Sequence, residues 1–308
     1  MWLGFFLYYI LDRWQEISKD FRTFGDESPN CINYEEIKNN LKKSLNTNGW
    51  DGRWYKRAYM DNGDALGSME NEECRIDGIS QSWSVISNAG DNDKKFISMQ
   101  SLENHLIDRE IGIIKLLDPP FYKGKLEPGY IKAYMPGVRE NGGQYTHAAI
   151  WAIIAECMLG FGDKAIELYK MINSIEHSKV REAANKYKVE PYVIPADVYG
   201  NGNLQGRGGW TWYTGSSSWY YKTGVEYILG LRINKGILEI KPCIPKDWKE
   251  YKVRYEYKTS VYDITIKKQE ENEENVIKEL LLDGEKTNNN QINLIDDGKF
   301  HEVIAILK

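Results

Sequence analysis

One carboxylic acid of this chain stands among aromatic residues, where it is suited to proton transfer. Asp51 lies between Trp50 and Gly52, and Trp54 and Tyr55 follow it. Rings packed around a carboxylic acid desolvate its charged form and raise its pKa, so that it can give a proton to a leaving oxygen such as that of a glycosidic bond. The alternative is that Asp51 only starts the turn at Gly52. The local residues leave both interpretations open.

The second candidate is a histidine at the predicted start of a helix. The stretch Arg139 to His147 (RENGGQYTH) runs into the apolar segment Ala148 to Cys157, with Thr146 as the predicted N-cap. His147 would lie in the first helical turn, where free backbone N–H groups and the helix dipole favour an anion. A protonated imidazole would add to that attraction. A structural histidine packed under the loop is the alternative interpretation.

A glycine-rich loop ahead of another predicted helix is the third candidate. Residues Gly206 to Ser216 read GRGGWTWYTGS, so that backbone amides can approach an oxyanion, and the Thr214 hydroxyl with the Gly215 N–H forms a compact donor pair. Trp210 and Trp212 could stack on a sugar. The alternative is a tight glycine turn with core tryptophans. The pattern is neither a Walker loop nor a dinucleotide fingerprint.

Helices joined by long loops are predicted to position these residues. Hydrophobic periodicity of about 3.6 residues dominates up to Leu231, and long ordered loops on a helical scaffold usually carry function. The predicted helices span Trp2 to Phe21, Tyr34 to Leu45, Ile76 to Asn88, Lys94 to Leu106, Thr146 to Leu159, Asp163 to Ile172 and Ser217 to Leu229. The loops between them span Asn46 to Met69, Pro119 to Tyr145 and Pro191 to Ser216.

Short alternating runs replace the helical pattern after Leu231 and predict strands. Turn signals at Asp283-Gly284 and Asp297-Gly298 separate the later runs. The predicted strands are Leu238 to Ile240, Val253 to Tyr257, Val261 to Lys267, Glu279 to Leu282 and Glu302 to Leu307. The sequence therefore predicts a mainly α protein with a β appendix, divided into residues 1–231 and 232–308.

Composition favours a polar small molecule over nucleic acid or membrane as the partner. The 308 residues carry a net charge of −5 without a long basic block, which gives no electrostatic attraction to nucleic acid or an anionic membrane. The 10 tryptophans and 21 tyrosines outnumber the 8 phenylalanines, so most aromatic rings carry a hydrogen-bonding group and can stack on a sugar face.

The remaining ionisable and sulfur-containing residues suggest no further chemistry. The cysteines show no metal-ligand spacing, so we expect buried reduced thiols and no metal at Cys31, Cys74, Cys157 and Cys243. The acidic run Glu70 to Glu73 is either a solvated face or part of a sugar-binding rim. We assign no role to the isolated His105, His177 and His301.

The apolar opening run Met1 to Leu11 resembles a signal peptide only in its length. It lacks a basic start and a small-residue cleavage site, and it is too short to span a bilayer. Its pattern continues at helical spacing through Trp14 and Ile17, so we expect a buried helix in a cytoplasmic protein. The abrupt start inside a helix suggests a truncated chain.

Taken together, the motif segments resemble the family 94 glycoside phosphorylases, the cellobiose phosphorylase family. The resemblance covers nearly the whole chain. The residues around Glu72 to Asp77 resemble the carboxy-terminal module of cyclic β-1,2-glucan synthases more than the disaccharide-specific cellobiose or chitobiose phosphorylases. It rests on Trp50 to Gly52, Gly67 to Trp83 (GSMENEECRIDGISQSW), Gly129 to Trp151 (GYIKAYMPGVRENGGQYTHAAIW), Glu190 to Tyr199 (EPYVIPADVY), Gly208 to Gly215 (GGWTWYTG) and Leu238 to Trp248 (LEIKPCIPKDW).

The resemblance implies a fold. Members of the family have an (α/α)6 barrel between an amino-terminal β-sandwich and a carboxy-terminal β-domain. Residues 1–231 would form the carboxy-terminal part of the barrel, and residues 232–308 a small β-sandwich-like domain. The amino-terminal half has no counterpart in the chain, so the chain alone could be inactive, and a partner carrying that half or a second copy of the chain could complete it.

The resemblance also implies a reaction, the inverting transfer of a glucosyl unit from the end of a β-linked gluco-oligosaccharide to inorganic phosphate. Phosphate is already an anionic nucleophile, so only a general acid is needed and no cofactor is expected. The implied roles are general acid for Asp51, phosphate binding for His147, Thr214 and Gly215, and sugar binding for Trp50, Tyr134, Arg139 and Glu140. One departure is Arg53, where the family usually has glutamate.

Two other functions stay open at the level of the sequence. Related barrels hydrolyse glucans with a second carboxylate, and phosphate dependence would distinguish the two reactions. A non-catalytic carbohydrate-binding remnant of a split gene would bind sugar without turnover.

Overall fold

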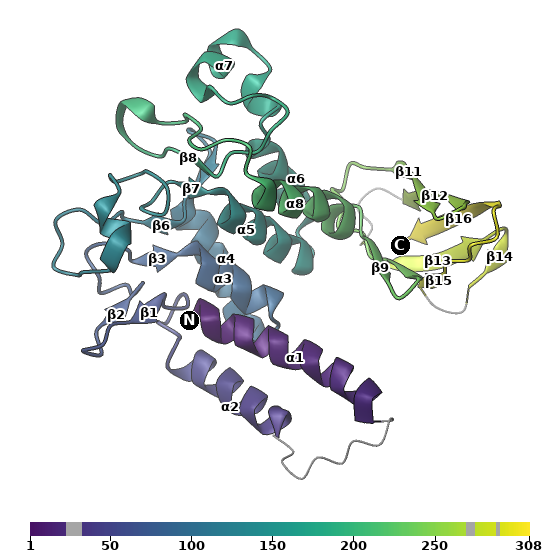
Figure 1. Ribbon diagram of the computed structural model, residues 1–308, viewed down its shortest axis with the longest axis horizontal. Coiled ribbons are helices and arrows are strands. Elements are labelled where there is room, and N and C mark those ends of the chain that lie inside the picture. The colour runs from purple at the N-terminus through teal and green to yellow at the C-terminus, as the bar shows by residue number, and fades with distance from the viewer. Residues whose placement is uncertain (23–32, 269–274, 288–289) are drawn as a thin grey trace. The chain divides into compact units, whose positions relative to one another are not determined.

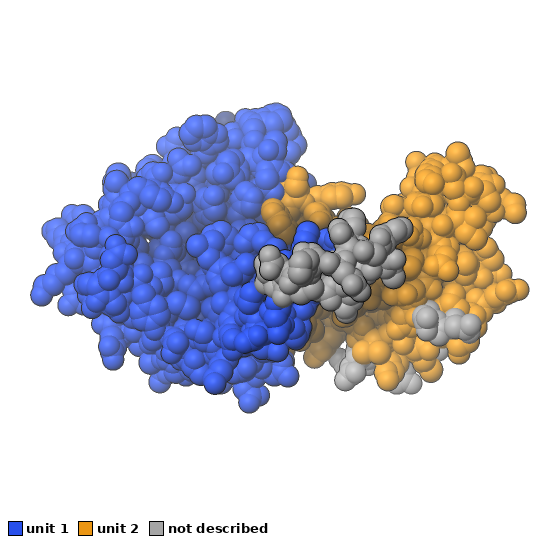
Figure 2. Space-filling view, turned by 60° about the horizontal axis from the view of Figure 1, so that its bottom comes forward, with its two compact units in different colours: residues 1–155, 171–217 blue, residues 156–170, 218–308 orange. Residues whose placement is uncertain are grey.

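The computed structural model describes residues 1–22, 33–268, 275–287 and 290–308. By their internal contacts these residues form two compact units, one of residues 1–155 and 171–217 and the other of residues 156–170 and 218–308 (Figure 2). The last helical turn ends at Ile228 and the next strand begins at Leu231. A domain boundary at residue 231 stays a prediction.

Helices dominate the first three-quarters of the chain, as the sequence predicts (Figure 1). Two short 3-10 helices lie within predicted loops, whereas helix α7 and a third 3-10 helix lie between Ile172 and Pro191, where no element was predicted. The helices are α1 (Trp2–Arg22), α2 (Tyr34–Thr47), α3 (Gly78–Ile86), α4 (Asn92–Leu106), α5 (Thr146–Met158), α6 (Gly162–Met171), α7 (Arg181–Tyr187) and α8 (Thr214–Lys222). The 3-10 helices are η1 (Gly129–Ala133), η2 (Glu176–Ser178) and η3 (Gly202–Leu204), and a π-helical turn, η4 (Thr223–Ile228), follows α8.

Local residue types explain where α3 begins and why α5 is central. The Asp77 carboxylate caps α3, because it accepts the backbone N–H groups of Ile79 at 3.0 Å and Ser80 at 3.2 Å. Helix α5 is apolar on every side, and both Ile150 and Ile153 are fully buried. A helix that is apolar all round is stable only when neighbours cover all of it.

Aromatic rings connect the first helices to the Asp51 loop. Phe5 of α1 meets Tyr55 of the loop edge-on at 5.0 Å between ring centroids. Trp83 of α3 meets Trp151 of α5 in the same way at 5.4 Å. The loop therefore rests on the helical core.

Short strands join the loops at one end of α3, α4 and α5 (Figure 1). The backbone N–H of Leu116, just before β6, donates to the carbonyl of Gly143, just before β7, at 2.8 Å and links two of the pairs. The antiparallel pairs are β1 (Ala58–Tyr59) with β2 (Ala65–Leu66), β3 (Ile76–Asp77) with β6 (Leu117–Asp118), β4 (Ile107–Asp108) with β5 (Ile113–Ile114), and β7 (Gln144–Tyr145) with β8 (Asp197–Val198). These two-residue strands were not predicted.

The carboxy-terminal strands form two sheets with one core between them, which agrees with the predicted small β-domain. The five-stranded sheet has the order β11-β12-β16-β13-β14, in which β12 and β16 are parallel, and the second sheet has the order β15-β10-β9. One cluster contains Leu238 from the smaller sheet and Ile264 and Val303 from the larger one. The strands are β9 (Leu231–Asn234), β10 (Ile237–Ile240), β11 (Glu250–Tyr257), β12 (Ser260–Lys268), β13 (Ile277–Leu282), β14 (Glu285–Lys286), β15 (Gln291–Asn293) and β16 (Phe300–Leu307).

Only one face of α1 is buried, which corrects the prediction of a buried amino-terminal helix. Phe5 is fully buried, but Leu3 is 68% exposed and Trp14 is 45% exposed. Among the described residues, no helix combines the length and apolar character needed to cross a membrane. Cys74, Cys157 and Cys243 are buried free thiols, as predicted, and Cys31 lies outside the described residues.

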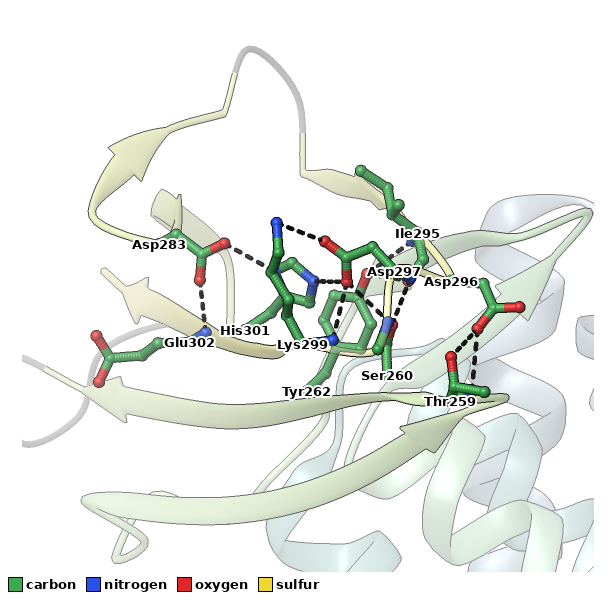
Figure 3. Close-up of polar contacts among 11 residues, drawn as sticks. Thr259, Ser260, Tyr262, Asp283, Ile295, Asp296, Asp297, Lys299, His301 and Glu302 are labelled. Atoms are coloured by element: carbon green, nitrogen blue, oxygen red, sulfur yellow. Dashed lines mark hydrogen bonds and ion pairs between the residues drawn. The ribbon is translucent and has the colours of Figure 1, made fainter.

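His301 is held between two carboxylates, although no role was predicted for it (Figure 3). Its Nδ1 lies 2.8 Å from Asp283 Oδ2 and its Nε2 lies 3.1 Å from Asp297 Oδ1, while Tyr262 stacks on the ring. The hydrogen bond to Asp283, with help from Asp297, raises the pKa of His301. The Asp297 carboxylate also accepts the Ser260 hydroxyl at 3.2 Å, so the cluster ties the turn before β16 to β12.

We predict that this cluster makes the β-domain more stable in mild acid than in alkali. The folded pKa of His301 lies above the unfolded value, so its contribution is complete below about pH 6.5 and is lost as the pH rises through the folded value. His301→Gln should shrink the difference between the thermal unfolding midpoints at pH 5.5 and pH 8.5 by a few degrees, because an exposed pair of this kind contributes up to about 1 kcal/mol. An unchanged difference would show that the cluster does not couple protonation to folding.

Candidate functional site

The Asp51 carboxylate is surrounded by hydrogen-bond donors. Its Oδ1 accepts the Ser68 hydroxyl at 3.1 Å and its Oδ2 accepts the Met69 backbone N–H at 2.6 Å. The ammonium of Lys56 is 4.0 Å from Oδ1, and the Asp51 side chain is 13% exposed. The prediction of an acid enclosed by aromatic rings is therefore incomplete, because the donors come from Ser68 and Met69 at the far end of the same predicted loop.

Buried polar contacts fix the turn that carries Asp51. The Asp51 N–H donates to the Trp54 carbonyl at 2.9 Å and closes the turn. The fully buried Gln81 of α3 accepts the Tyr55 N–H and donates to the Tyr55 carbonyl, both at 2.8 Å. The Trp54 indole donates to the carbonyls of Gly67 and Arg75. Asp51 thus sits on a turn that is held from both sides.

Trp50 packs against the helical core beside this turn. Its ring meets Tyr55 at 5.0 Å, and the Lys94 ammonium lies 5.8 Å from its ring centroid. These contacts occupy part of the ring that the resemblance assigns to sugar binding. A sugar-binding role for Trp50 stays a prediction.

His147 and the start of α8 lie against each other. The Nδ1 of His147 is 3.1 Å from the Ser216 hydroxyl, and a Cβ added to Gly215 would stand 2.9 Å from His147 Nε2. Only glycine leaves room at position 215 for this approach. The first turn of α5 and the first turn of α8 thus meet, with Thr214 and Gly215 exposed to solvent. The three residues predicted to bind phosphate are brought together.

The imidazole of His147 does not add a positive charge to the site. Burial lowers its pKa, so the structure favours a neutral ring, without the extra attraction that a protonated ring would bring. When the Ser216 hydroxyl donates to Nδ1, Nε2 carries the hydrogen and faces Gly215. Thr146 is the first residue of α5, and its buried hydroxyl makes no hydrogen bond within the described residues, so a capping role is not supported.

Arg139 is held between two aromatic rings. Its guanidinium carbon is 5.5 Å from the ring centroid of Tyr134 and 5.6 Å from that of Trp210. Its Nε is 3.9 Å from Glu140 Oε2. The backbone of Arg139 has a φ of 52°, which costs about 1–3 kcal/mol for a residue with a side chain and is common at functional sites. Three of the predicted sugar-binding residues, Tyr134, Arg139 and Glu140, are therefore neighbours.

Asp197 is a buried carboxylate of this region that the sequence analysis missed. It is 1% exposed, its Oδ1 accepts the Trp210 N–H at 3.3 Å, and its Oδ2 makes no hydrogen bond within the described residues. Burial raises its pKa, and the Trp210 N–H and the Arg139 guanidinium oppose that rise. Asp197 lies in the segment EPYVIPADVY. It is buried beside Arg139, which is 58 positions earlier in the sequence, so no local pattern could have revealed its burial.

Strand β8 connects the second and third candidate loops. Tyr145 pairs with Asp197, the Thr146 N–H donates to the Ala196 carbonyl at 2.9 Å, and the Ala196 N–H donates to the Trp210 carbonyl at 2.6 Å. The loops of Arg139 to His147 and of Gly206 to Ser216 are therefore fixed to one strand. The side-chain contacts of Asp51 lie within its own segment, residues 51–69.

The structure also shows how exposed the two loop tryptophans and the acidic run Glu70 to Glu73 are. Trp210 and Trp212 are 67% and 62% exposed, so they are not core tryptophans. Glu70 and Glu72 are exposed, whereas Glu73 accepts the backbone N–H groups of a loop at 2.9 Å and 2.7 Å and anchors it. Among the described residues, no group of three or more His, Cys, Asp or Glu side chains could hold a metal ion.

The chain consists of helices joined by loops that carry the candidate residues, followed by a small β-domain. Residues 1–230 match the family model described as the glycosyl hydrolase 94 superfamily, catalytic domain. The chain belongs to the glycosyl hydrolase 94 superfamily. Residues 231–275 match the model described as the glycosyl hydrolase family 65, C-terminal domain.

Similar proteins include one synthase and two phosphorylases. A cyclic beta-(1,2)-glucan synthase of Rhizobium meliloti is 42% identical over 90% of this chain and 10% of its own length. A solabiose phosphorylase of Paenibacillus borealis is 29% identical over 98% of this chain and 38% of its own. An N,N'-diacetylchitobiose phosphorylase of Vibrio proteolyticus is 30% identical over 86% of this chain and 33% of its own. The chain thus spans well under half of each relative.

Proposed function

We propose that this chain carries the general acid and the phosphate site of an inverting glycoside phosphorylase acting on β-linked gluco-oligosaccharides. In this reaction Asp51 protonates the leaving sugar oxygen while phosphate attacks the anomeric carbon from the opposite face, giving α-glucose 1-phosphate and a shortened glucan. The observation that carries the proposal is the meeting of His147 with Thr214 and Gly215 at two helix starts, since such an arrangement favours an anion.

The relatives support this proposal over others. Two of them are named phosphorylases, and inorganic phosphate would be the co-substrate here without a further cofactor or metal. Neutral His147 would donate one hydrogen bond from Nε2, and the exposed start of α8 would add the Thr214 hydroxyl and the Gly215 N–H. Arg139, Glu140 and Tyr134 would contact the sugar, and Trp50 would border it.

We predict that His147→Ala or Thr214→Val selectively weakens phosphate use. Each change removes one donor to an anion, a loss that raises the KM for phosphate by about 10- to 100-fold. The KM for glucan should stay within about twofold, because these donors do not contact the sugar. Initial rates at varied phosphate and saturating glucan measure the effect in the completed enzyme, in which the chain is joined to the amino-terminal part that its longer relatives carry.

Thr47→Val is the matched control, because Thr47 is an exposed threonine at the end of α2 whose hydroxyl bonds only to carbonyls of its own helix. It should leave both KM values unchanged. Equal increases in the KM for phosphate and for glucan would reject the assignment of a phosphate site to His147 and Thr214.

We also propose that the helices form the carboxy-terminal part of an (α/α)6 barrel that a further polypeptide segment completes. The exposed face of α1 supports this, because Leu3, Leu7, Ile10 and Trp14 are between 44% and 68% exposed and recur at helical spacing. The completing segment would be the amino-terminal half, either joined or supplied in trans, with a second copy of the chain as the alternative.

Two other functions make different predictions. A glucan hydrolase with the same barrel would use Glu140 or Asp197 as a second carboxylate to activate water and would need no phosphate. A carbohydrate-binding remnant of a split gene would bind glucan without turnover by itself, and adding the missing half would restore turnover. Phosphate-dependent turnover of the completed enzyme excludes the hydrolase, and turnover by this chain alone excludes the remnant.

A further inference from the structure

We propose that Tyr130 and Trp210 extend the proposed sugar contacts of Tyr134 and Arg139 into a ledge that binds further glucose units of a glucan chain. The ledge is a succession of neighbouring groups. The rings of Tyr130 and Tyr134 are 6.3 Å apart, and the Arg139 guanidinium carbon follows at 5.5 Å from Tyr134 and 5.6 Å from Trp210. Four groups in succession offer more contact than one sugar unit covers. The inference rests on the proposed function for the identity of the sugar.

The two ends of the ledge are open to solvent. Tyr130 and Trp210 are each 67% exposed, although each ring has a neighbour on one side. Large aromatic groups that remain exposed in one region mark a binding surface more often than isolated ones do. Rings with an apolar face and a polar edge suit the alternating C–H and hydroxyl surfaces of a sugar.

Tyr134 and Trp210 are also held by their neighbours before any ligand arrives. The Arg139 guanidinium attracts the faces of Tyr134 and Trp210. The backbone of Trp210 is bonded on both sides, since its N–H donates to Asp197 Oδ1 at 3.3 Å and its carbonyl accepts the Ala196 N–H at 2.6 Å. A preorganised surface loses little conformational freedom on binding, so its contacts contribute more to affinity.

The position of the ledge points to a glucan chain as its occupant. Arg139 is the residue next to Glu140, and their side chains form an ion pair at 3.9 Å, so the ledge continues from the residues proposed to contact the sugar at the cleaved bond. An acidic or basic ligand is disfavoured, because the carboxylates of Glu140 and Asp197 oppose the charge of Arg139. A neutral polyhydroxylated chain fits this balance.

Binding by the 308-residue chain tests the inference without any need for turnover. Isothermal titration calorimetry would use linear β-1,2-linked and β-1,4-linked gluco-oligosaccharides of two, four and six units. We expect affinity to rise with length for at least one linkage. Trp210→Ala should weaken binding of the hexasaccharide by about tenfold and that of the disaccharide by less than about twofold, since one exposed ring at the far end of the ledge is lost.

Two further variants separate the loss of a ring from a loss of folding. Trp210→Phe keeps an aromatic face and should retain most of the length dependence. Phe300→Ala removes an exposed ring of the β-domain, 75% exposed, and should change nothing. Circular dichroism spectra identical to that of the original chain would confirm folding of each variant.

The results of these binding experiments test the ledge independently of the proposed reaction. Affinity that does not rise with length, an equal loss for short and long ligands in Trp210→Ala, or no loss at all would overturn the ledge, even if phosphorolysis is found. Length-dependent binding that requires Trp210 would support the ledge, even if the completed enzyme proves not to be a phosphorylase.

Discussion

Asp51→Asn is expected to lower the turnover of natural glucan by about two to four orders of magnitude in the completed enzyme, because it removes the transferable proton of the proposed general acid. The amide keeps an oxygen that can accept from Ser68 or from the Met69 N–H, which hold the present carboxylate at 3.1 Å and 2.6 Å. The turn should therefore remain folded, and glucan binding should persist. Steady-state phosphorolysis rates of the original enzyme and the variant measure the effect.

The size of the loss should depend on the leaving group. A sugar alkoxide departs poorly without protonation, whereas an activated aryl glucoside, if it is a substrate, needs much less help from an acid. Asp61→Asn is the matched control, since Asp61 is an exposed aspartate of the neighbouring turn. Near-normal turnover of natural glucan by Asp51→Asn would make Asp51 a structural turn residue and would require another general acid.

Features set by neighbouring residues could be predicted from the sequence. Helix α5 and the place of His147 in its first turn follow from local periodicity and from the loop before it. The change from helices to strands near Leu231 is also local, because side-chain alternation replaces the helical repeat. Strands β9 and β15 were missed, since runs of three or four residues carry little pattern of their own and depend on pairing with β10.

Features set by contacts between distant residues could not be predicted. The donors to Asp51 come from Ser68 and Met69, and the burial that lowers the pKa of His147 comes from the packed loops around it. Asp197 looks like an ordinary residue of an extended segment, yet it is buried beside Arg139. The predicted roles of these loops come from the resemblance to a family, whereas their contacts come from the structure.

We expect phosphate, and not water, to accept the glucosyl unit. The proposed site provides anion donors at His147, Thr214 and Gly215 and needs no carboxylate to activate water, so the reaction should stop when phosphate is removed. The most direct measurement follows the completed enzyme and a β-linked gluco-oligosaccharide by ³¹P and ¹H NMR, with and without inorganic phosphate. We expect α-glucose 1-phosphate in the first case and no cleavage in the second, whereas equal release of glucose in phosphate-free buffer would overturn the proposed reaction.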